Sequence, residues 1–245
     1  MDELDGRTGL ADAFDSAATR YDLLTGLNPG YHRHLDAAAR GLAERLGTEA
    51  GLLVDLGCGS GASTAALLRH VRDARVVGID ASAGMLAQAQ SKQWPAGVEF
   101  HHLPAQRLAE LDLPPVDGVM AAYLLRNLNA SDRDRVLATI LDGLRPGGWL
   151  VLQEYSVAGR RWAGLRWTLV CWLVVIPLSW LVRGSPRLYR YLWRSVRDFD
   201  STAVLHHRLG RAGFTGVEQL AVTGWQRGIL HTFLAQRPHR PTASR

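Results

Sequence analysis

Asp55, Gly57, Gly59 and Gly61 stand close together in the stretch VDLGCGSGAST, where they could bind a polar ligand. A short apolar run typical of a strand precedes them, and a helical pattern begins directly after them. Glycine lets the backbone turn sharply and approach a ligand closely, and the amides at a helix start are hydrogen-bond donors. The G-x-G-x-G spacing differs from the G-x-G-x-x-G of dinucleotide-binding turns, and no P-loop lysine follows. Taken alone, the stretch is equally typical of a tight turn.

Asp80 is a second acid that ends an apolar run, ARVVGID, the next one along the chain. A carboxylate at the end of the second strand can accept hydrogen bonds from both hydroxyls of a ribose. Its alternative role is to cap the helix that begins in SAGML, and the two roles are compatible. The glycine turn and Asp80 together predict a site for a cofactor that contains a nucleoside.

The elements that position these residues alternate along the chain. Short β-branched runs predict five strands in GLLVDLG, ARVVGID, GVEFHHL, VDGVMAAYLL and WLVLQEY. Helical patterns lie between them, and the one before RPGG is expected to begin at a Ser131 cap. Strands that alternate with helices at this spacing predict an α/β fold with a mostly parallel sheet. Two later runs, GVEQLAVT and GILHTFLAQR, predict an antiparallel hairpin at the sheet edge, which makes seven strands.

Composition limits the class of protein. The 245 residues can form one large domain or two small ones, and the net charge of +5 allows an anionic partner. Because the chain has only two cysteines, Cys58 and Cys171, we expect no disulfide framework, and a reducing, cytoplasmic compartment fits. The acidic N-terminus predicts no export signal. No His, Cys or Asp cluster has metal-ligand spacing, and no nucleic-acid motif accompanies the basic charge.

Six ordered motifs resemble those of the ubiquinone/menaquinone biosynthesis C-methyltransferase family. Members of this family are S-adenosylmethionine-dependent enzymes with a Rossmann-like sheet. The resemblance runs from about Phe14 to Ala235 and is carried by AFDSAATRYDLL, VVGIDASAGMLAQA, YLLRNL, LRPGGWLVLQEYS, YRYLWRSVRDF and AGFTGVEQLAVTG. It implies S-adenosylmethionine as the methyl donor. It also implies a hydrophobic aromatic acceptor, a prenylated hydroquinone being the leading candidate.

The resemblance assigns a set of cofactor-binding positions. They are Tyr21, Asp55, Gly57, Gly59, Ser60, Gly61, Asp80, Ala81, Met85, Ala105 and Ala122. Two positions depart from the family pattern. Pro104 stands where the family has Asp or Asn against the adenine, and Ala122 stands where it usually has Ser.

Methylation of a carbon atom requires a nucleophilic acceptor, so a base or an oriented water must remove a proton from a ring hydroxyl. The resemblance makes Arg126 the candidate for stabilising the phenolate or positioning that water, with Asn127 orienting Arg126. His32 is an alternative base, because imidazole titrates near neutrality. The acceptor pocket is expected to include Tyr123, Glu154, Tyr155, Trp172 and Trp180.

The stretch RWTLVCWLVVIPLSWLVRG contains 16 consecutive uncharged, mostly apolar residues. As a helix it would span about 24 Å, short of the roughly 30 Å hydrocarbon core of a bilayer, and Pro177 is expected to interrupt it. It has five of the chain's eight tryptophans in or beside it, and eight arginines against two acids lie between Ser156 and Asp200. Aromatic and arginine side chains beside an apolar stripe suit a membrane interface. A buried core helix is the alternative.

The expected organisation has five parts: an N-terminal helical cap (1–50), a cofactor-binding core (51–155), a lid segment (156–200), a C-terminal helix and hairpin (201–237) and a disordered tail (238–245). We expect the lid segment to cover the acceptor pocket and to contact an anionic membrane. The leading hypothesis is a C-methyltransferase for a prenylated hydroquinone. The alternatives are a C- or O-methyltransferase that tailors another hydrophobic aromatic or polyketide-like metabolite, and a non-catalytic homologue that binds the cofactor.

Overall fold

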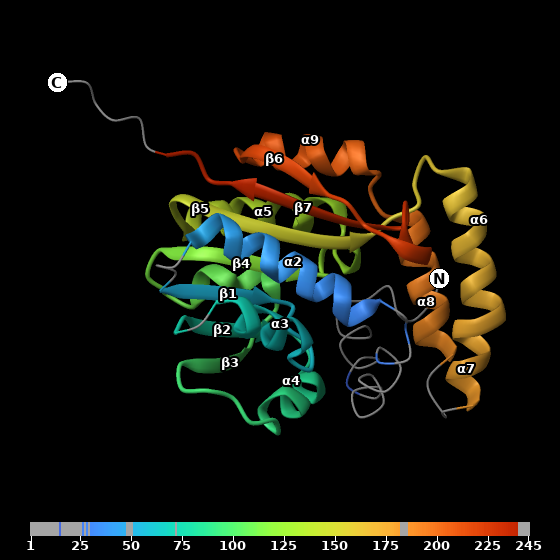
Figure 1. Ribbon diagram of the computed structural model, residues 1–245, viewed down its shortest axis with the longest axis horizontal. Coiled ribbons are helices and arrows are strands. Elements are labelled where there is room, and N and C mark those ends of the chain that lie inside the picture. Colours follow the sequence, from blue (N-terminus) through green and yellow to red (C-terminus); the bar gives the residue numbers. More distant parts are fainter. Residues whose placement is uncertain are drawn as a thin grey trace.

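A computed structural model describes residues 15, 26, 28, 30–47, 51–71, 73–181 and 186–239. Its centre is one twisted seven-stranded sheet in the order β3-β2-β1-β4-β5-β7-β6 (Figure 1). All neighbouring strands are parallel except β7, which is antiparallel to both β5 and β6. The predicted sheet and edge hairpin are therefore confirmed. The strands are β1 (Leu52–Leu56), β2 (Arg75–Asp80), β3 (Val98–His102), β4 (Val116–Ala122), β5 (Leu144–Tyr155), β6 (Thr215–Leu220) and β7 (Leu230–Gln236).

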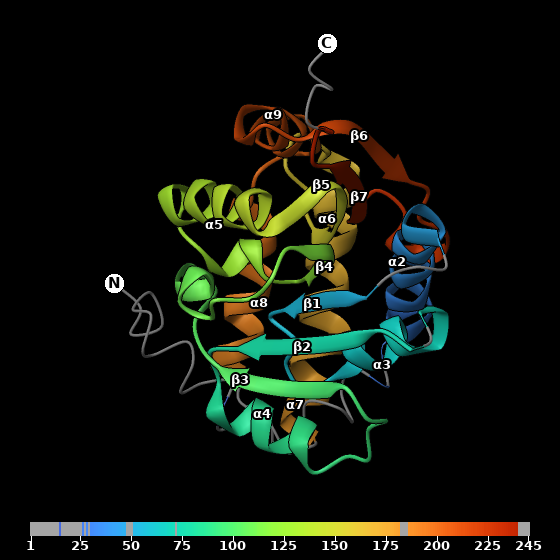
Figure 2. The same cartoon turned by 90° about the vertical axis from the view of Figure 1, so that its left-hand side faces the viewer.

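Helices cover both faces of the sheet, as Figure 2 shows. On one face α2 (Tyr31–Leu46) and α3 (Ala62–His70) bury an apolar stripe, which includes Leu35, Leu42 and Leu67, against the central strands. On the other face α5 (Ala130–Gly143) and α9 (Thr202–Ala212) do the same. The shorter α4 (Ala83–Gln90) connects β2 to β3 along the chain. This layered arrangement buries β1 completely and fixes the ends of the strands where the predicted cofactor residues lie.

The start of α5 differs from the prediction of a Ser131 cap. Asn129 is the cap, and its side-chain oxygen accepts a hydrogen bond from the backbone amide of Asp132 at 2.9 Å. Ser131 lies inside the first turn and donates its hydroxyl to the same oxygen at 2.7 Å. Both residues are of types that favour caps, and the chain uses the earlier one.

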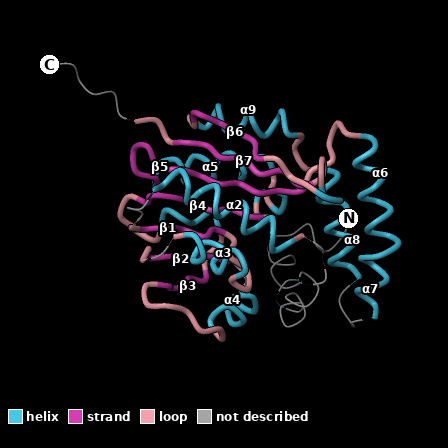
Figure 3. Tube along the Cα trace, viewed as in Figure 1, coloured by secondary structure: helices cyan, strands magenta, loops and turns pink. Residues whose placement is uncertain are grey.

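The lid segment is helical and consists of α6 (Arg161–Val170), the π-helical turn η4 (Cys171–Val175), α7 (Ile176–Leu181) and α8 (Pro186–Asp198). Figure 3 shows these helices standing together at one end of the sheet. They begin directly after β5, so they lie at the carboxyl ends of the parallel strands. This is the edge where ligands bind in open α/β sheets.

Pro177 does not interrupt the apolar helix, contrary to the prediction. The π-helical turn precedes it, with the amide of Ile176 bonded to the carbonyl of Cys171, and the helix then continues through α7. A π-bulge is one way for a helix to accommodate a missing donor and a bulky ring. Within the described part of the chain, Arg161–Leu178 is one helical stretch long and apolar enough to cross a membrane by length and composition alone. The predicted interruption at Pro177 is therefore wrong, whereas length and composition alone do not decide whether this helix spans a membrane.

Candidate active site

A cavity of about 500 Å³ opens at the carboxyl ends of β1, β2 and β4. Its walls come from the loop after β1, the ends of β2 and β4, the start of α2 and the turns that follow β3 and β4. Most of the predicted cofactor residues that the structure describes lie in these walls: Gly57, Gly59, Ser60, Asp80, Ala81, Met85 and Ala122. Tyr21 lies outside the described residues.

The loop after β1 requires glycine at every second position. Gly57, Gly59 and Gly61 have φ values of 77°, 53° and 89°, which other residues rarely adopt. Two of the loop amides do not point to a ligand, although the sequence had suggested ligand-binding amides here. Those of Gly57 and Cys58 donate to the carbonyl of Ile79 at 2.7 and 3.0 Å. The loop is therefore bonded to the end of β2, and its bare backbone forms the cavity wall.

Asp80 joins this loop to the start of α4. One carboxylate oxygen accepts the amide of Gly59 and the other accepts the amide of Ser82, both at 2.8 Å. Burial raises the pKa of Asp80. Ser82, and not Asp80, caps α4, since its hydroxyl accepts the amide of Met85. Each carboxylate oxygen has further lone pairs, so Asp80 can still accept a hydroxyl of a ligand in the cavity.

Two predicted cofactor residues lie behind the loop instead of in the wall. Asp55 is fully buried, and one of its oxygens accepts the hydroxyls of Ser63 and Thr64 at 2.7 and 2.6 Å, which fixes the start of α3. Burial raises the pKa of Asp55 to about 6. Gly61 is packed under Trp94, whose ring atoms lie 2.7 and 2.9 Å from the position that a Cβ would take.

The far end of the cavity contains residues that sequence reasoning missed. His102, the last residue of β3, and Gln106 and Arg107 after it line the wall together with Pro104, whereas Ala105 is buried beside them. Asp15 also lines the wall, and its carboxylate accepts the amide of Gly84 at 2.8 Å. The side chains of His102 and Gln106 could have been suspected as polar groups flanking the proline, but nothing in their spacing set them apart.

Tyr123, Arg126 and Asn127 lie together at the end of β4 and line the same cavity. Tyr123 has φ of 59°, a strained conformation for a residue with a side chain. This bend turns its carbonyl toward the next residues, where it accepts hydrogen bonds from Arg126 Nη1 at 3.2 Å and Asn127 Nδ2 at 3.0 Å. Arg126 Nη1 also donates to Asn127 Oδ1 at 3.1 Å. Asn127 thus contacts Arg126 directly, and the roles predicted for this pair stay predictions.

Glu154 lies behind this turn and does not line the cavity. Its Oε1 accepts the backbone amides of Leu125 and Arg126, while Oε2 lies 4.0 Å from Arg126 Nε. Neither Oε2 nor Nε has a hydrogen-bond partner among the described residues. Burial raises the pKa of Glu154 to about 7, even though Arg126 and Arg133 lower it. The structure therefore places Glu154 as a support for η3 (Leu125–Asn127) instead of as an acceptor contact.

A column of four stacked rings leads from the cavity to the lid segment. Tyr31 and Tyr123 line the cavity and stack with centroids 5.4 Å apart, Tyr155 follows at 4.9 Å, and Trp167 of α6 follows at 5.5 Å. Tyr155 is hence one layer behind the wall. From α8, Tyr191 donates its hydroxyl to Asn127 Oδ1 at 3.4 Å, a contact that the sequence did not reveal.

Two further predicted residues, His32 and Trp172, lie away from the cavity. His32 is exposed on α2, with its ring edge against Tyr31. Trp172 is 47% exposed on the outer side of the lid segment, in edge contact with Trp193. The side chain of Trp180 lies outside the described residues. No group of three His, Cys, Asp or Glu side chains that could hold a metal ion occurs in the described ranges.

Comparison with known proteins gives consistent results. A model of the ubiE/COQ5 methyltransferase family matches residues 2–235. Demethylmenaquinone methyltransferase of Mycobacterium tuberculosis (strain ATCC 25618 / H37Rv) is 31% identical over 236 residues, which cover 95% of this chain and 94% of that protein. The enzyme of the same name from Thermus thermophilus is 32% identical over 213 residues, 86% of this chain and 95% of the relative.

Solved structures share the fold at low sequence identity. Magnesium protoporphyrin IX methyltransferase from Synechocystis PCC 6803, solved with bound SAH, has a TM-score of 0.67 and 18% identity and covers 95% of this chain and all of that one. Human N-acetylserotonin methyltransferase, solved with SAM, has a TM-score of 0.64 and 17% identity, covering 97% of this chain and 59% of that one.

The cavity fits such a cofactor, because the carboxylate of Asp80 and the side-chain-free backbone of Gly57 and Gly59 share its wall. The roles of the individual residues stay predictions. The match over nearly the whole chain and the identity with curated relatives both point to one family. This chain belongs to the ubiE/COQ5 methyltransferase family and is a methyltransferase that uses S-adenosylmethionine.

Proposed function

We propose that this chain transfers a methyl group to a ring carbon of a prenylated hydroquinone of the menaquinone or ubiquinone type. The relatives named demethylmenaquinone methyltransferase support this acceptor class. The observation that carries the proposal is the composition of one cavity wall. Asp80 and the glycine loop line the cavity, and Arg126 and Asn127 line the same cavity.

These two groups of lining residues suit different tasks, one toward the cofactor and one toward the acceptor. When bound, S-adenosylmethionine supplies an electrophilic methyl group, and Asp80 would hold its ribose. Arg126 is buried, so its positive charge would stabilise a phenolate strongly. A ring hydroxyl of the acceptor would first give its proton to water in the open cavity, and the ring carbon next to the phenolate would then take the methyl group, leaving the cofactor as a neutral thioether. The same carbon would finally release its own proton to water. Tyr31 and Tyr123, which line the same cavity, would give the acceptor ring apolar aromatic neighbours.

A product assay tests the acceptor class. Purified protein is given S-adenosylmethionine and either a short-chain demethylmenaquinol or non-prenylated phenols, and the methylated products are identified by mass spectrometry. We expect C-methylation of the quinol, and rescue of a bacterial strain that lacks its quinone-ring methyltransferase. Methylation of the phenols alone would identify a tailoring enzyme instead. Cofactor binding without any methylation would identify a non-catalytic homologue.

We also propose that the lid segment lies on an anionic membrane surface, which would make the protein a peripheral one on the inner face of the membrane. One side of α6 and η4 is packed on the domain through Ala163, Trp167 and Cys171. The opposite side exposes large apolar side chains: Trp162, Leu165, Leu169, Trp172, Leu173 and Val174. A helix packed along a domain in this way suits a position in the membrane plane better than a span.

The lid segment also carries exposed positive charge, which indicates which lipids it would meet. Among its described side chains, the exposed arginines are Arg160, Arg161, Arg166, Arg190, Arg194 and Arg197. Arginine near an anionic bilayer contributes about 1 kcal/mol per charge. A prenylated acceptor could then reach the cavity from the lipid phase.

Flotation with vesicles tests this contact. We expect wild-type protein to float with vesicles that contain phosphatidylglycerol and to float less with purely zwitterionic vesicles. The double variant Trp162→Gln, Leu173→Gln removes the two most exposed apolar side chains, 84% and 71% exposed, and should stay in the soluble fraction. Val204→Gln is the matched control, because Val204 is 46% exposed on α9. Equal flotation of the double variant and the control would rule out the proposed surface.

A further inference from the structure

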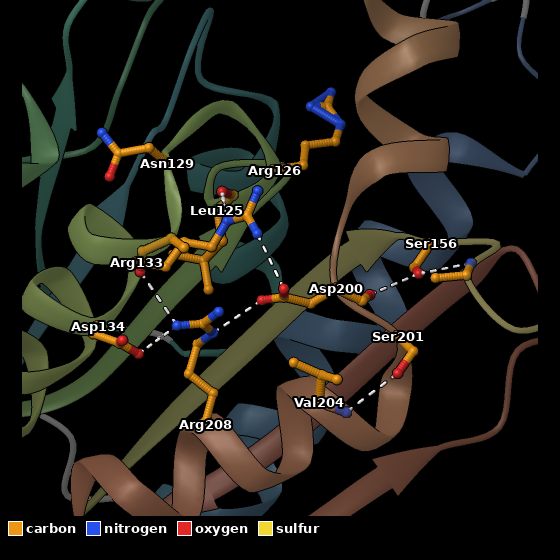
Figure 4. Close-up of polar contacts among 12 residues, drawn as sticks. Leu125, Arg126, Asn129, Arg133, Asp134, Ser156, Asp200, Ser201, Val204 and Arg208 are labelled. Atoms are coloured by element: carbon orange, nitrogen blue, oxygen red, sulfur yellow. Dashed lines mark hydrogen bonds and ion pairs between the residues drawn. The ribbon is translucent and has the colours of Figure 1, made fainter.

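The two ends of the lid segment meet at one point behind the active site. Ser156 follows directly after β5, and Asp200 follows two residues after the end of α8. The hydroxyl of Ser156 donates to the backbone carbonyl of Asp200 at 2.8 Å (Figure 4). This hydrogen bond therefore joins the entry and the exit of the lid segment, and we call it the pivot.

Asp200 is held at this pivot by two arginines. Its Oδ1 lies 3.1 Å from Arg133 Nη1, and its Oδ2 accepts Arg208 Nε at 2.9 Å. The side chain of Asp200 is 13% exposed and those of the two arginines are 11% exposed, so all three charges are largely removed from water. Buried charges of this kind depend strongly on their partners.

Arg133 also reaches the turn that carries the candidate catalytic residues. Its Nε donates to the carbonyl of Leu125 at 3.0 Å, and Leu125 is the first residue of η3. The plane of the same guanidinium lies over the ring of Phe199, with Cζ 4.6 Å from the ring centroid. One side chain on α5 thus contacts the exit of the lid segment and the turn of Arg126 at the same time.

The other side of this turn is held by Glu154, which accepts the amides of Leu125 and Arg126. The turn is therefore fixed between a buried carboxylate and a buried guanidinium. The guanidinium side leads, through Asp200, to the exit of the lid segment. The contact between Tyr191 of α8 and Asn127 is a second link from the same segment to the same turn.

We propose that Arg133 is a positioning residue for methyl transfer, which couples the place of the lid segment to the orientation of Arg126 and Asn127. When the lid segment is seated, Asp200 holds Arg133, and Arg133 holds the carbonyl of Leu125. The inference rests on the proposed function for its activity measurement. Its structural content concerns η3 alone and can be measured without any acceptor.

Arg133→Lys tests the proposal, because lysine keeps the charge but cannot bond Leu125 and Asp200 together through a planar fork. We expect kcat to fall about 10- to 100-fold, as small misplacements of reacting groups do. The dissociation constant for S-adenosylhomocysteine should stay within about twofold, because the cofactor end of the cavity is not changed.

Arg208→Lys is the matched control. Arg208 bonds the same carboxylate, the carboxylate of Asp134 and the carbonyl of Ala130 at 3.2 Å, but within the described part of the chain it does not contact η3. A merely structural role for these arginines predicts equal losses of stability and of kcat in both variants. The positioning role predicts a loss of kcat in Arg133→Lys and a change of less than about threefold in Arg208→Lys.

Hydrogen exchange of the peptide that covers Tyr123 to Leu128 reads the turn directly. Faster exchange in Arg133→Lys than in Arg208→Lys is expected even if the true acceptor is not a quinol, which separates this inference from the proposed function. Should Arg133→Lys not fold, Ser156→Ala, which removes the hydrogen bond at the pivot and a longer one from the amide of Ala158, is expected to speed the same exchange. Wild-type exchange in the folded variants, or equal kcat losses in both lysine variants, would overturn the coupling.

Discussion

Glu154→Gln is expected to change how the stability of the protein depends on pH. Glu154 is fully buried, and burial raises its pKa from 4.5 to about 7. A raised pKa means that the fold favours the protonated carboxyl. Its contribution to stability is therefore complete below pH 4.5, and it is lost as the pH rises through about 7. Glutamine does not titrate and has no such loss.

The size of the effect follows from the shift. At about 1.36 kcal/mol for each pH unit, a displacement from 4.5 to about 7 corresponds to about 3 kcal/mol in total. Between pH 5 and pH 8 we expect the difference in unfolding free energy between variant and wild type to move by roughly 2–3 kcal/mol in favour of the variant. Only this change with pH is predicted, because the substitution also alters hydrogen bonds by a constant amount.

Urea unfolding at four pH values between 5 and 8 measures the difference. Glu44→Gln is the control, since Glu44 is exposed on α2, and its difference from wild type should stay nearly constant. If the difference for Glu154→Gln stays constant as well, or moves in favour of the wild type, burial does not determine the ionisation of Glu154. The support of the turn by a carboxyl of raised pKa would then be refuted.

Three further predictions concern the cavity. Gly57→Ala should weaken binding of S-adenosylhomocysteine at least 10-fold by calorimetry, because φ is 77° and a Cβ would lie 3.1 Å from Leu124. Gly47→Ala is the control, since Gly47 also has a positive φ, 71°, but a Cβ there would meet open space. This control should lower the stability of the protein and leave the affinity unchanged. Asp80→Asn should weaken the same binding about 10- to 100-fold, since a neutral amide accepts ribose hydroxyls less well than a carboxylate, and unchanged affinity would remove Asp80 from the cofactor site. Arg126→Ala should lower kcat about 100-fold or more with cofactor affinity nearly intact, and a collapse of that affinity would contradict the role given to Arg126.

The sheet and the cofactor end of the cavity could be predicted because their signals are local. Gly57 and Gly59 must adopt left-handed backbone conformations, and Asp80 ends a strand whose apolar run is short and continuous. Such features depend on residues close in sequence, so the positions of the loop and the acid were right. The hydrogen bonds of the Gly57 and Cys58 amides were not predicted, because their acceptor, the carbonyl of Ile79, belongs to the neighbouring strand.

The acceptor side was harder to predict because its contacts are long-range. Glu154 reads as an acid at a strand end, and nothing nearby in sequence shows that it faces the amides of Leu125 and Arg126 across the sheet. Arg133 and Tyr191 likewise act through partners far along the chain. The helix through Pro177 shows a different failure, since a rule for regular α-helices does not include a π-helical turn.

The hydrogen bond between Ser156 and Asp200 has a consequence for how this architecture can diversify. Because the segment from 157 to 199 leaves and re-enters the domain at neighbouring points, it can be exchanged, shortened or lengthened with little disturbance of the strands that it joins. The acceptor preference could thus evolve by exchange of this segment, while the part of the domain that binds the methyl donor stays the same. A chimera that carries another relative's insertion between these two residues would be a natural starting point for altering which ring is methylated.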